Sequence, residues 1–222
     1  MSAMRLMLRS KPVQLRFKIG RLLGPVLFSA LVLLAGCSDE AQPVAISEGA
    51  VVLAFGDSLT FGTGARPEQS YPSRLADLTH WNIVNAGVPG ELSAQGLKRL
   101  PELLEKHRPE LLILCHGGND LLRRKNDAQT AGTIGQMIQL ALDQQIQVVL
   151  VAVPKPTVIL SDASFYEEIA QQYPVVFVDQ LMTDVLSDNR LKADAAHPNA
   201  AGYQQFTQQL FQQLQDAGLI IQ

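Results

Sequence analysis

The stretch VVLAFGDSLT, residues 51–60, decides the fold class, because it joins an apolar run of strand length to a polar turn. Residues 51–55 are all apolar, which is typical of a strand buried on both faces of a sheet. Gly56, Asp57 and Ser58 follow directly, and such residues favour a turn or the cap of a helix. We therefore expect a buried strand that delivers Ser58 to the first turn of a helix.

Strands and helices alternate along the rest of the chain. Further short apolar runs occur at residues 83–84 with their neighbours, 111–115, 148–153 and 175–178. Segments with helical spacing of apolar residues occur at 71–79, 94–107, 128–144, 164–172 and 199–215. This alternation predicts an α/β domain with a parallel sheet, helices on both of its faces and right-handed crossovers.

Polar clusters follow three of the predicted strands, and a fourth cluster precedes the last helix. Ligands of such sheets bind at the carboxyl ends of the strands, so these clusters form the candidate site. We expect all four to converge on one edge of the sheet. They are GDSLT at 56–60, NAGVPG at 85–90, GGND at 117–120 and DAAHPN at 194–199.

The clusters hold the groups that acyl transfer requires: a nucleophile, a base, a group that orients the base, and donors for the oxyanion. Ser58 is the candidate nucleophile, His197 the base, and Asp194 the carboxylate that orients the imidazole. The backbone N–H groups of Ser58 and Gly90 and the side-chain amide of Asn119 are the candidate oxyanion hole. Glycine at position 90 allows a close approach of the backbone to a substrate.

In this order and at these intervals the four clusters resemble the four blocks of the SGNH (GDSL) hydrolases, over nearly the whole chain from residue 51. The stretch 85–120 is most similar to the bacterial thioesterase I, lysophospholipase and arylesterase group. The resemblance implies a three-layer α/β/α, flavodoxin-like fold with a five-stranded parallel sheet, the same site residues, and no metal or organic cofactor. Residues 154–173 depart from the thioesterases, in which this loop shapes the acyl pocket.

The predicted function is a serine esterase for acyl or aryl esters, with thioesters and lysophospholipids as further candidates. A carbohydrate O-deacetylase of the cell envelope is one alternative, and a non-catalytic ligand-binding surface lipoprotein is another. The G-x-S-x-G motif of α/β-hydrolases and the phosphate-binding P-loop are absent from the sequence. GTG at 62–64 lacks the third glycine of a dinucleotide fingerprint.

The first 36 residues have the composition of a lipoprotein signal peptide. Six basic residues and no acidic ones occur there, and the apolar run at 22–34 is short for a membrane span. Leu34-Ala35-Gly36-Cys37 resembles the bacterial lipobox, in which the cysteine is lipidated and becomes the mature N-terminus. We expect a signal peptide at 1–36, a tether at 37–50 and the hydrolase domain at 51–222.

Lipidation of Cys37 predicts a protein anchored on the periplasmic side of the bacterial cell envelope, and Ser38 favours the outer membrane over the inner one. An uncleaved transmembrane helix is the alternative. Removal of residues 1–36 takes the net charge from −3 to about −9, which argues against a nucleic-acid partner. We expect a monomer whose partners are the membrane and a small-molecule or lipid ester substrate.

Overall fold

The computed structural model describes residues 43–220. The predicted signal peptide at 1–36, the candidate lipidation site Cys37 and the tether as far as residue 42 lie outside the described residues. Within 43–220 no helix combines the length and the apolar character that crossing a bilayer requires.

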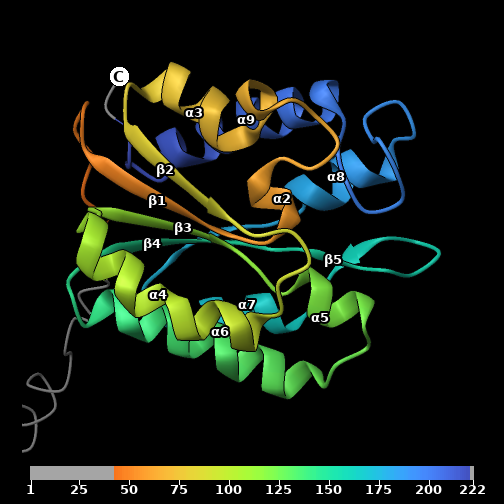
Figure 1. The fold of residues 1–222 in the computed structure, drawn as a ribbon, viewed down its shortest axis with the longest axis horizontal. Helices are drawn as coiled ribbons and strands as arrows, with labels where there is room; N and C mark the ends of the chain where they lie inside the picture. The colour runs from red at the N-terminus through yellow and green to blue at the C-terminus, as the bar shows by residue number, and fades with distance from the viewer. Residues whose placement is uncertain (1–42, 221–222) are drawn as a thin grey trace, which may run out of the picture. The chain divides into compact units, whose positions relative to one another are not determined.

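Five parallel strands form the central sheet, in the order β2-β1-β3-β4-β7 (Figure 1). This confirms the predicted α/β class with a five-stranded parallel sheet. The three inner strands are almost fully buried apolar runs, as a sheet covered on both faces requires, whereas the edge strand that contains Asn82 and Asn85 is partly exposed. The strands are β1 (Val51–Gly56), β2 (Asn82–Gly87), β3 (Leu111–Cys115), β4 (Gln147–Val151) and β7 (Val176–Val178).

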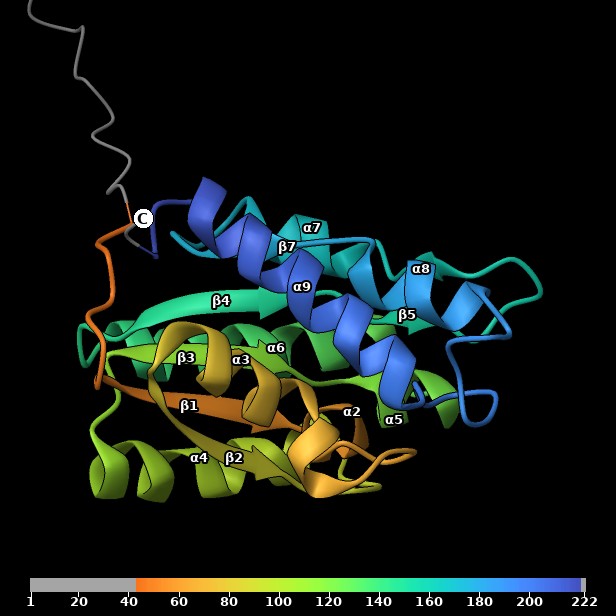
Figure 2. The same ribbon diagram turned by 90° about the horizontal axis from the view of Figure 1, so that it is seen from above.

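Helices cover both faces of the sheet, which gives the three layers that the sequence predicts (Figures 1 and 2). One layer contains α3 (Tyr71–Thr79), α8 (Leu181–Ser187) and α9 (Ala200–Asp216). The other contains α4 (Ser93–His107), α6 (Asp127–Leu142) and α7 (Phe165–Ala170). A 3₁₀ turn, η2 (Pro67–Gln69), precedes α3.

The apolar core lies on both faces of the sheet and is centred on β3, whose five residues are all fully buried. On one face Tyr71 of α3 packs against Phe206 of α9, with ring centroids 5.2 Å apart. On the other face α6 contributes the fully buried Ile134 and Ile138. Burial of each such side chain stabilises the fold by about 1.5–3 kcal/mol.

Several short elements that the sequence patterns do not delimit lie at the carboxyl edge of the sheet. The chain leaves β4 at Val151, two residues earlier than predicted, and forms an antiparallel hairpin of β5 (Pro154–Lys155) and β6 (Ser161–Asp162). One-turn helices follow two of the strands: α2 (Ser58–Phe61) after β1 and α5 (Gly118–Leu122) after β3. In Figure 1 these elements gather at the ends of the strand arrows.

The chain enters the fold at the amino edge of the sheet, before the predicted domain boundary at residue 51. Ile46 is buried, and its N–H donates to the carbonyl of Leu219 at 2.9 Å. The backbone of Val44 makes two hydrogen bonds, of 2.7 and 2.8 Å, with the side-chain amide of Gln147 at the start of β4. Residues 43–50 of the predicted tether therefore pack against the domain.

Replacement of Ile46 by alanine tests this packing. Because Ile46 is buried, we expect Ile46→Ala to lower the free energy of unfolding by about 2–5 kcal/mol, measured by urea denaturation of the purified protein. Val44→Ala is the matched control, since the Val44 side chain is 68% exposed. Equal stability of the two variants would show that this segment contributes nothing to the fold.

Candidate active site

Ser58 is placed by the end of β1 and a tight turn. The Asp57 carboxylate accepts a hydrogen bond from the N–H of Leu59 at 3.1 Å and so caps α2, whose first residue is Ser58. A Cβ at Gly56 would lie 2.0 Å from the carbonyl oxygen of Cys115, so only glycine fits between β1 and β3 here. The turn presents the Ser58 side chain at the carboxyl edge of the sheet.

A chain of hydrogen bonds joins Asp194, His197 and Ser58. The Asp194 carboxylate lies 2.8 Å from Nδ1 of His197, and Nε2 of the same ring lies 2.9 Å from Ser58 Oγ. With the carboxylate as the acceptor at Nδ1, the neutral ring carries its proton there. Nε2 is then free to accept the proton of the Ser58 hydroxyl.

Backbone N–H groups hold Asp194 in its place. Its Oδ1 accepts hydrogen bonds from the N–H groups of Ala196 and His197, at 2.8 and 3.0 Å. Partial burial raises the pKa of Asp194, but the hydrogen bonds from Ala196 and His197 outweigh it, and the pKa lies below its usual value. Asp194 is therefore a carboxylate throughout the neutral range. Asn199 caps α9 directly after this loop.

Asn119 reaches the site from α5, and Asp57 holds it there. Its Nδ2 donates to Asp57 Oδ2 at 3.3 Å. The Asp57 side chain is almost fully buried, and this burial raises its pKa. The sequence analysis assigned Asp57 only to the turn around Ser58, and only the fold reveals its contact with Asn119, because the two residues are 62 positions apart.

Gly90 lies in the loop after β2, on the same edge of the sheet. It has a φ of 79°, and its carbonyl accepts a hydrogen bond from the Arg123 side chain at 3.1 Å. Unlike Ser58, His197 and Asn119, it is not one of the residues that line the cavity described next. The structure thus brings Ser58, His197 and Asn119 to that cavity, and Gly90 is not part of its lining.

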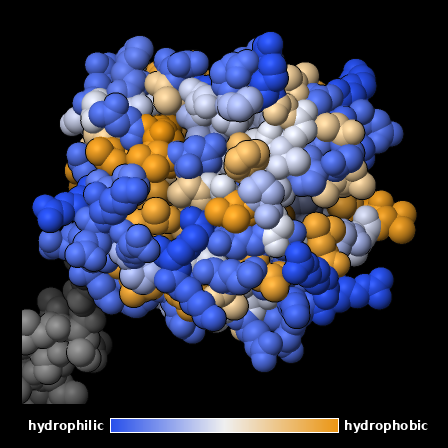
Figure 3. Space-filling model, in the orientation of Figure 1, coloured by the Kyte–Doolittle hydropathy of each residue, from blue (hydrophilic) through white to orange (hydrophobic). Residues whose placement is uncertain are grey.

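A cavity with mainly apolar walls opens above Ser58. Its empty volume is about 470 Å³, which includes the part that is open to solvent. Val158 and Ile159, at the tip of the β5–β6 hairpin beside it, are exposed, and Figure 3 shows apolar side chains projecting at that place. The polar lining is Asp57, Ser58, Asn119 and His197; the apolar walls are Leu59, Leu122, Val153, Pro154, Pro156, Leu160, Leu186, Ala195 and Ala196.

Within residues 43–220, no three or more His, Cys, Asp or Glu side chains are grouped so that they could hold a metal ion.

Glu91 is a further feature of this edge that was not singled out from the sequence. It follows Gly90 in the chain, and its carboxylate binds Arg99 and His116.

The sequence profile of the GDSL-like Lipase/Acylhydrolase family matches residues 54–205, which hold every predicted site residue of the domain. The chain belongs to this family. The resemblance to the SGNH (GDSL) hydrolases predicted from the four clusters is thereby confirmed, and the chain is an esterase or acylhydrolase of this type.

Named relatives agree with this assignment. The chain is 30% identical over 156 residues to the Thioesterase 1/protease 1/lysophospholipase L1 of Escherichia coli (strain K12), covering 67% of this chain and 75% of that protein. It is 30% identical over 181 residues to Esterase TesA of Pseudomonas aeruginosa, covering 77% and 90%. A crystal structure of TesA superposes with a TM-score of 0.67 at 26% identity, covering 75% of this chain and 99% of that one.

The depressed pKa of Asp194 predicts a pH dependence of stability. A carboxyl group with a lowered pKa stabilises the folded state above its unfolded pKa of about 3.9, and this contribution is lost as the pH falls through the folded pKa. We expect the free energy of unfolding to fall more steeply from about pH 6 to about pH 3 in the native protein than in Asp194→Asn, which does not titrate.

Urea denaturation at each pH measures this difference. Asp77→Asn, a change at an exposed residue of α3, is the matched control and should follow the native protein. Identical pH profiles for the native protein and Asp194→Asn would contradict the role assigned to the hydrogen bonds around Asp194.

Proposed function

We propose that the protein is a serine esterase that hydrolyses acyl or aryl esters, with thioesters and lysophospholipids in the same substrate class. The observation that carries the proposal is the hydrogen-bonded series Asp194–His197–Ser58, which ends at the floor of a cavity with apolar walls. Such a series is the arrangement by which a serine hydroxyl becomes a nucleophile near neutral pH.

In the first half of the reaction, Ser58 Oγ attacks the carbonyl carbon of the ester and its proton passes to Nε2 of His197. Asp194 stabilises the imidazolium that forms. When the tetrahedral intermediate collapses, the bond to the leaving oxygen or sulfur breaks, and His197 returns the proton to it. The acyl group then remains on Ser58.

In the second half, water attacks the acyl-enzyme while Nε2 of His197 takes one of its protons. The acyl–oxygen bond to Ser58 breaks, His197 returns the proton to Oγ, and the carboxylic acid leaves. The serine, the histidine and the carboxylate are then as they began, so no other co-reactant is needed.

The proposed oxyanion donors are the backbone N–H groups of Ser58 and Gly90 and the amide of Asn119. An amide –NH₂ group has two donor hydrogens, and Asp57 accepts only one of those of Asn119. The second hydrogen is left for the oxyanion, so the contact with Asp57 orients the amide without using it up. Gly90 offers a backbone without a side chain to obstruct the approach.

The apolar walls of the cavity favour an acyl or aryl group over a glycan. Leucine, valine, proline and alanine make up most of the lining, whereas a sugar requires polar partners for its hydroxyl groups. This argues for the esterase over the carbohydrate O-deacetylase.

Removal of the Ser58 hydroxyl tests the mechanism. We expect Ser58→Ala to abolish hydrolysis of p-nitrophenyl acyl esters, because no nucleophile remains, while the circular dichroism spectrum stays that of the native protein. Ser47→Ala, at an exposed serine, is the matched control and should retain full activity. Hydrolysis by Ser58→Ala at the native rate would overturn the assignment.

We also propose that the chain is a lipoprotein held in the bacterial cell envelope through lipidated Cys37, on the periplasmic side, with the outer membrane favoured by Ser38. The support is the sequence alone: a basic segment, an apolar run and a lipobox-like Leu-Ala-Gly-Cys in succession. More than one acyl chain on Cys37 gives stable anchoring, since each buried methylene contributes about 0.8 kcal/mol.

Expression of Cys37→Ser in bacteria tests the anchor. We expect the native protein to partition into the detergent phase of a Triton X-114 extraction and the variant to partition into the aqueous phase, because it cannot be acylated on sulfur. Detergent partitioning of both proteins would point instead to an uncleaved membrane helix.

A further inference from the structure

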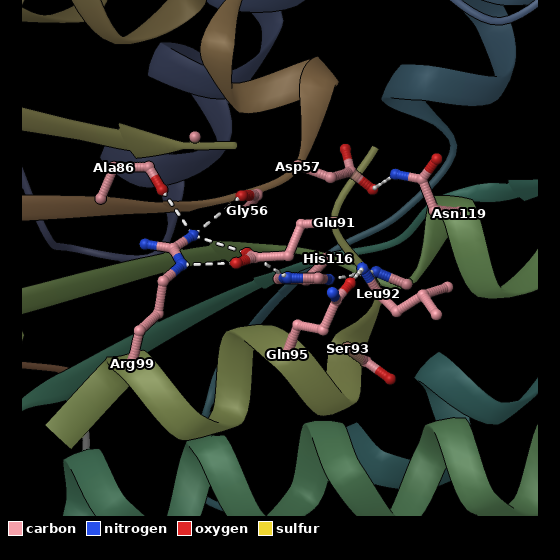
Figure 4. A network of polar contacts seen from close by, with 12 residues as sticks. Gly56, Asp57, Ala86, Glu91, Leu92, Ser93, Gln95, Arg99, His116 and Asn119 are labelled. Carbon is pink, nitrogen blue, oxygen red and sulfur yellow. Dashed lines mark hydrogen bonds and ion pairs between the residues drawn. The ribbon is translucent and has the colours of Figure 1, made fainter. Parts of the chain in front are cut away.

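An ion pair between Glu91 and Arg99, with the ring of His116 beside it, lies between the ends of the strands and α4 (Figure 4). The Glu91 side chain is 7% exposed, and its carboxylate accepts hydrogen bonds from Nε and Nη2 of Arg99, each at 2.7 Å. Nε2 of the fully buried His116 lies 3.1 Å from the same carboxylate. Burial raises the pKa of Glu91, but the hydrogen bonds from His116 and Arg99 outweigh it and keep the pKa below its usual value.

The partners of His116 fix which ring nitrogen carries the proton. Nδ1 accepts the backbone N–H of Gly117 at 2.9 Å, so the neutral ring holds its proton on Nε2 and donates it to Glu91. The carbonyl of His116 accepts the hydroxyl of Tyr166 at 2.6 Å. Both the ring and the backbone of His116 are therefore held in one orientation.

Arg99 connects this cluster to the ends of two strands. Its Nη2 also donates to the carbonyl of Ala86 in β2 at 2.8 Å and to that of Gly56, the last residue of β1, at 3.3 Å. The guanidinium lies over the ring of Phe55, 4.1 Å from its centroid. With His116 directly after β3, one guanidinium and one carboxylate link the ends of three neighbouring strands.

Two features of α4 serve this cluster. A Cβ at Gly96 would lie 2.5 Å from Nε2 of His116, so the packing of this ring requires a glycine. A glycine in a helix interior costs about 1 kcal/mol of stability relative to alanine. At the start of α4, Ser93 donates to the Asp120 carboxylate from its N–H at 2.8 Å and its hydroxyl at 2.9 Å. Asp120 is the neighbour of Asn119, so α4 is tied to that loop as well.

We propose that Arg99, Glu91 and His116 are positioning residues that fix the spacing of the oxyanion donors relative to Ser58. The proposal rests on the proposed function, because it assigns these residues a role in the same reaction. Several contacts of the cluster lie close in sequence to a proposed donor: Glu91 adjoins Gly90, and Gly56 is two residues before Ser58. His116 is three residues before Asn119.

The energetics of buried charge favour this role over simple stabilisation. Glu91 is 7% exposed and Arg99 24% exposed, so both ions lose much of their hydration on folding, and the attraction between them offsets that cost only partly. An apolar cluster of the same size would hold the loops together about as well. A bidentate pair with further backbone contacts instead fixes directions and distances, which is what oxyanion donors require.

Arg99→Lys and Glu91→Gln test the proposal. Lysine keeps the charge but lacks the planar fork, and glutamine keeps the shape of glutamate but loses its charge. We expect kcat for a p-nitrophenyl ester to fall about ten- to a hundredfold in each variant, while KM changes by less than about threefold. Arg190→Lys is the matched control, because it breaks a bidentate pair with Asp188 on the surface, and it should keep the native kcat.

A thionoester substrate separates positioning from a general loss of structure. Its sulfur replaces the carbonyl oxygen and accepts hydrogen bonds poorly, so it gains little from an oxyanion hole. We expect the ratio of kcat/KM for the oxygen ester to that for the thionoester to fall about tenfold in both variants. Asn119→Ala, which removes a proposed donor outright, should lower the same ratio and serves as the benchmark.

An unchanged kcat, or an equal loss on both esters, would overturn the proposal. So would unfolding of both variants, judged by circular dichroism, since the cluster would then be a requirement of the fold. Failure of the proposed function itself gives a different result, namely no ester hydrolysis by the native protein or by Arg190→Lys. The two failures are therefore distinguishable.

Discussion

The parallel pairing of β1 with β2 and β3 is the constraint on which the rest of the site depends. In this register Gly56 of β1 is paired with Gly87 of β2 and with Cys115 of β3. The three loops that follow therefore leave the sheet at the same height, and Ser58 and Asn119 need only short turns to meet. His197 completes the arrangement from the loop before α9.

The sequence predicted the long elements, which the structure confirms, and it named the candidate catalytic residues, but it did not show what connects them. Continuous apolar runs and helical periodicity are strong signals, so the five strands and the long helices were found. The helix at Ser58 was expected from its turn residues, whereas α5 is too short to show a period. The contact between Asp57 and Asn119 and the cluster around Glu91 join residues distant in sequence, so only the fold brings them together. Gly96 fits against His116 only once the fold places the two side by side.

Three carboxyl groups at this edge have pKa values that are shifted by their burial and their hydrogen bonds. Asp194 is open to solvent and held by backbone N–H groups, so its charged form is favoured. Asp57 is almost fully buried, and this burial raises its pKa although Leu59 and Asn119 donate hydrogen bonds to it. Glu91 is also buried, but Arg99 compensates for the loss of water. The same functional group thus serves as a partner of an imidazole, as a cap and as a structural anion.

The entry of the chain at the amino edge of the sheet bears on which esters the enzyme meets. Ser58 lies at the far end of β1, so the strand separates the reactive edge from the point where residue 43 joins the domain. From Cys37 to that point the backbone reaches at most about 20 Å. The cavity and residue 43 thus lie at opposite edges of the sheet, so an ester can enter the cavity without passing the segment through which the anchor proposed at Cys37 would join the domain.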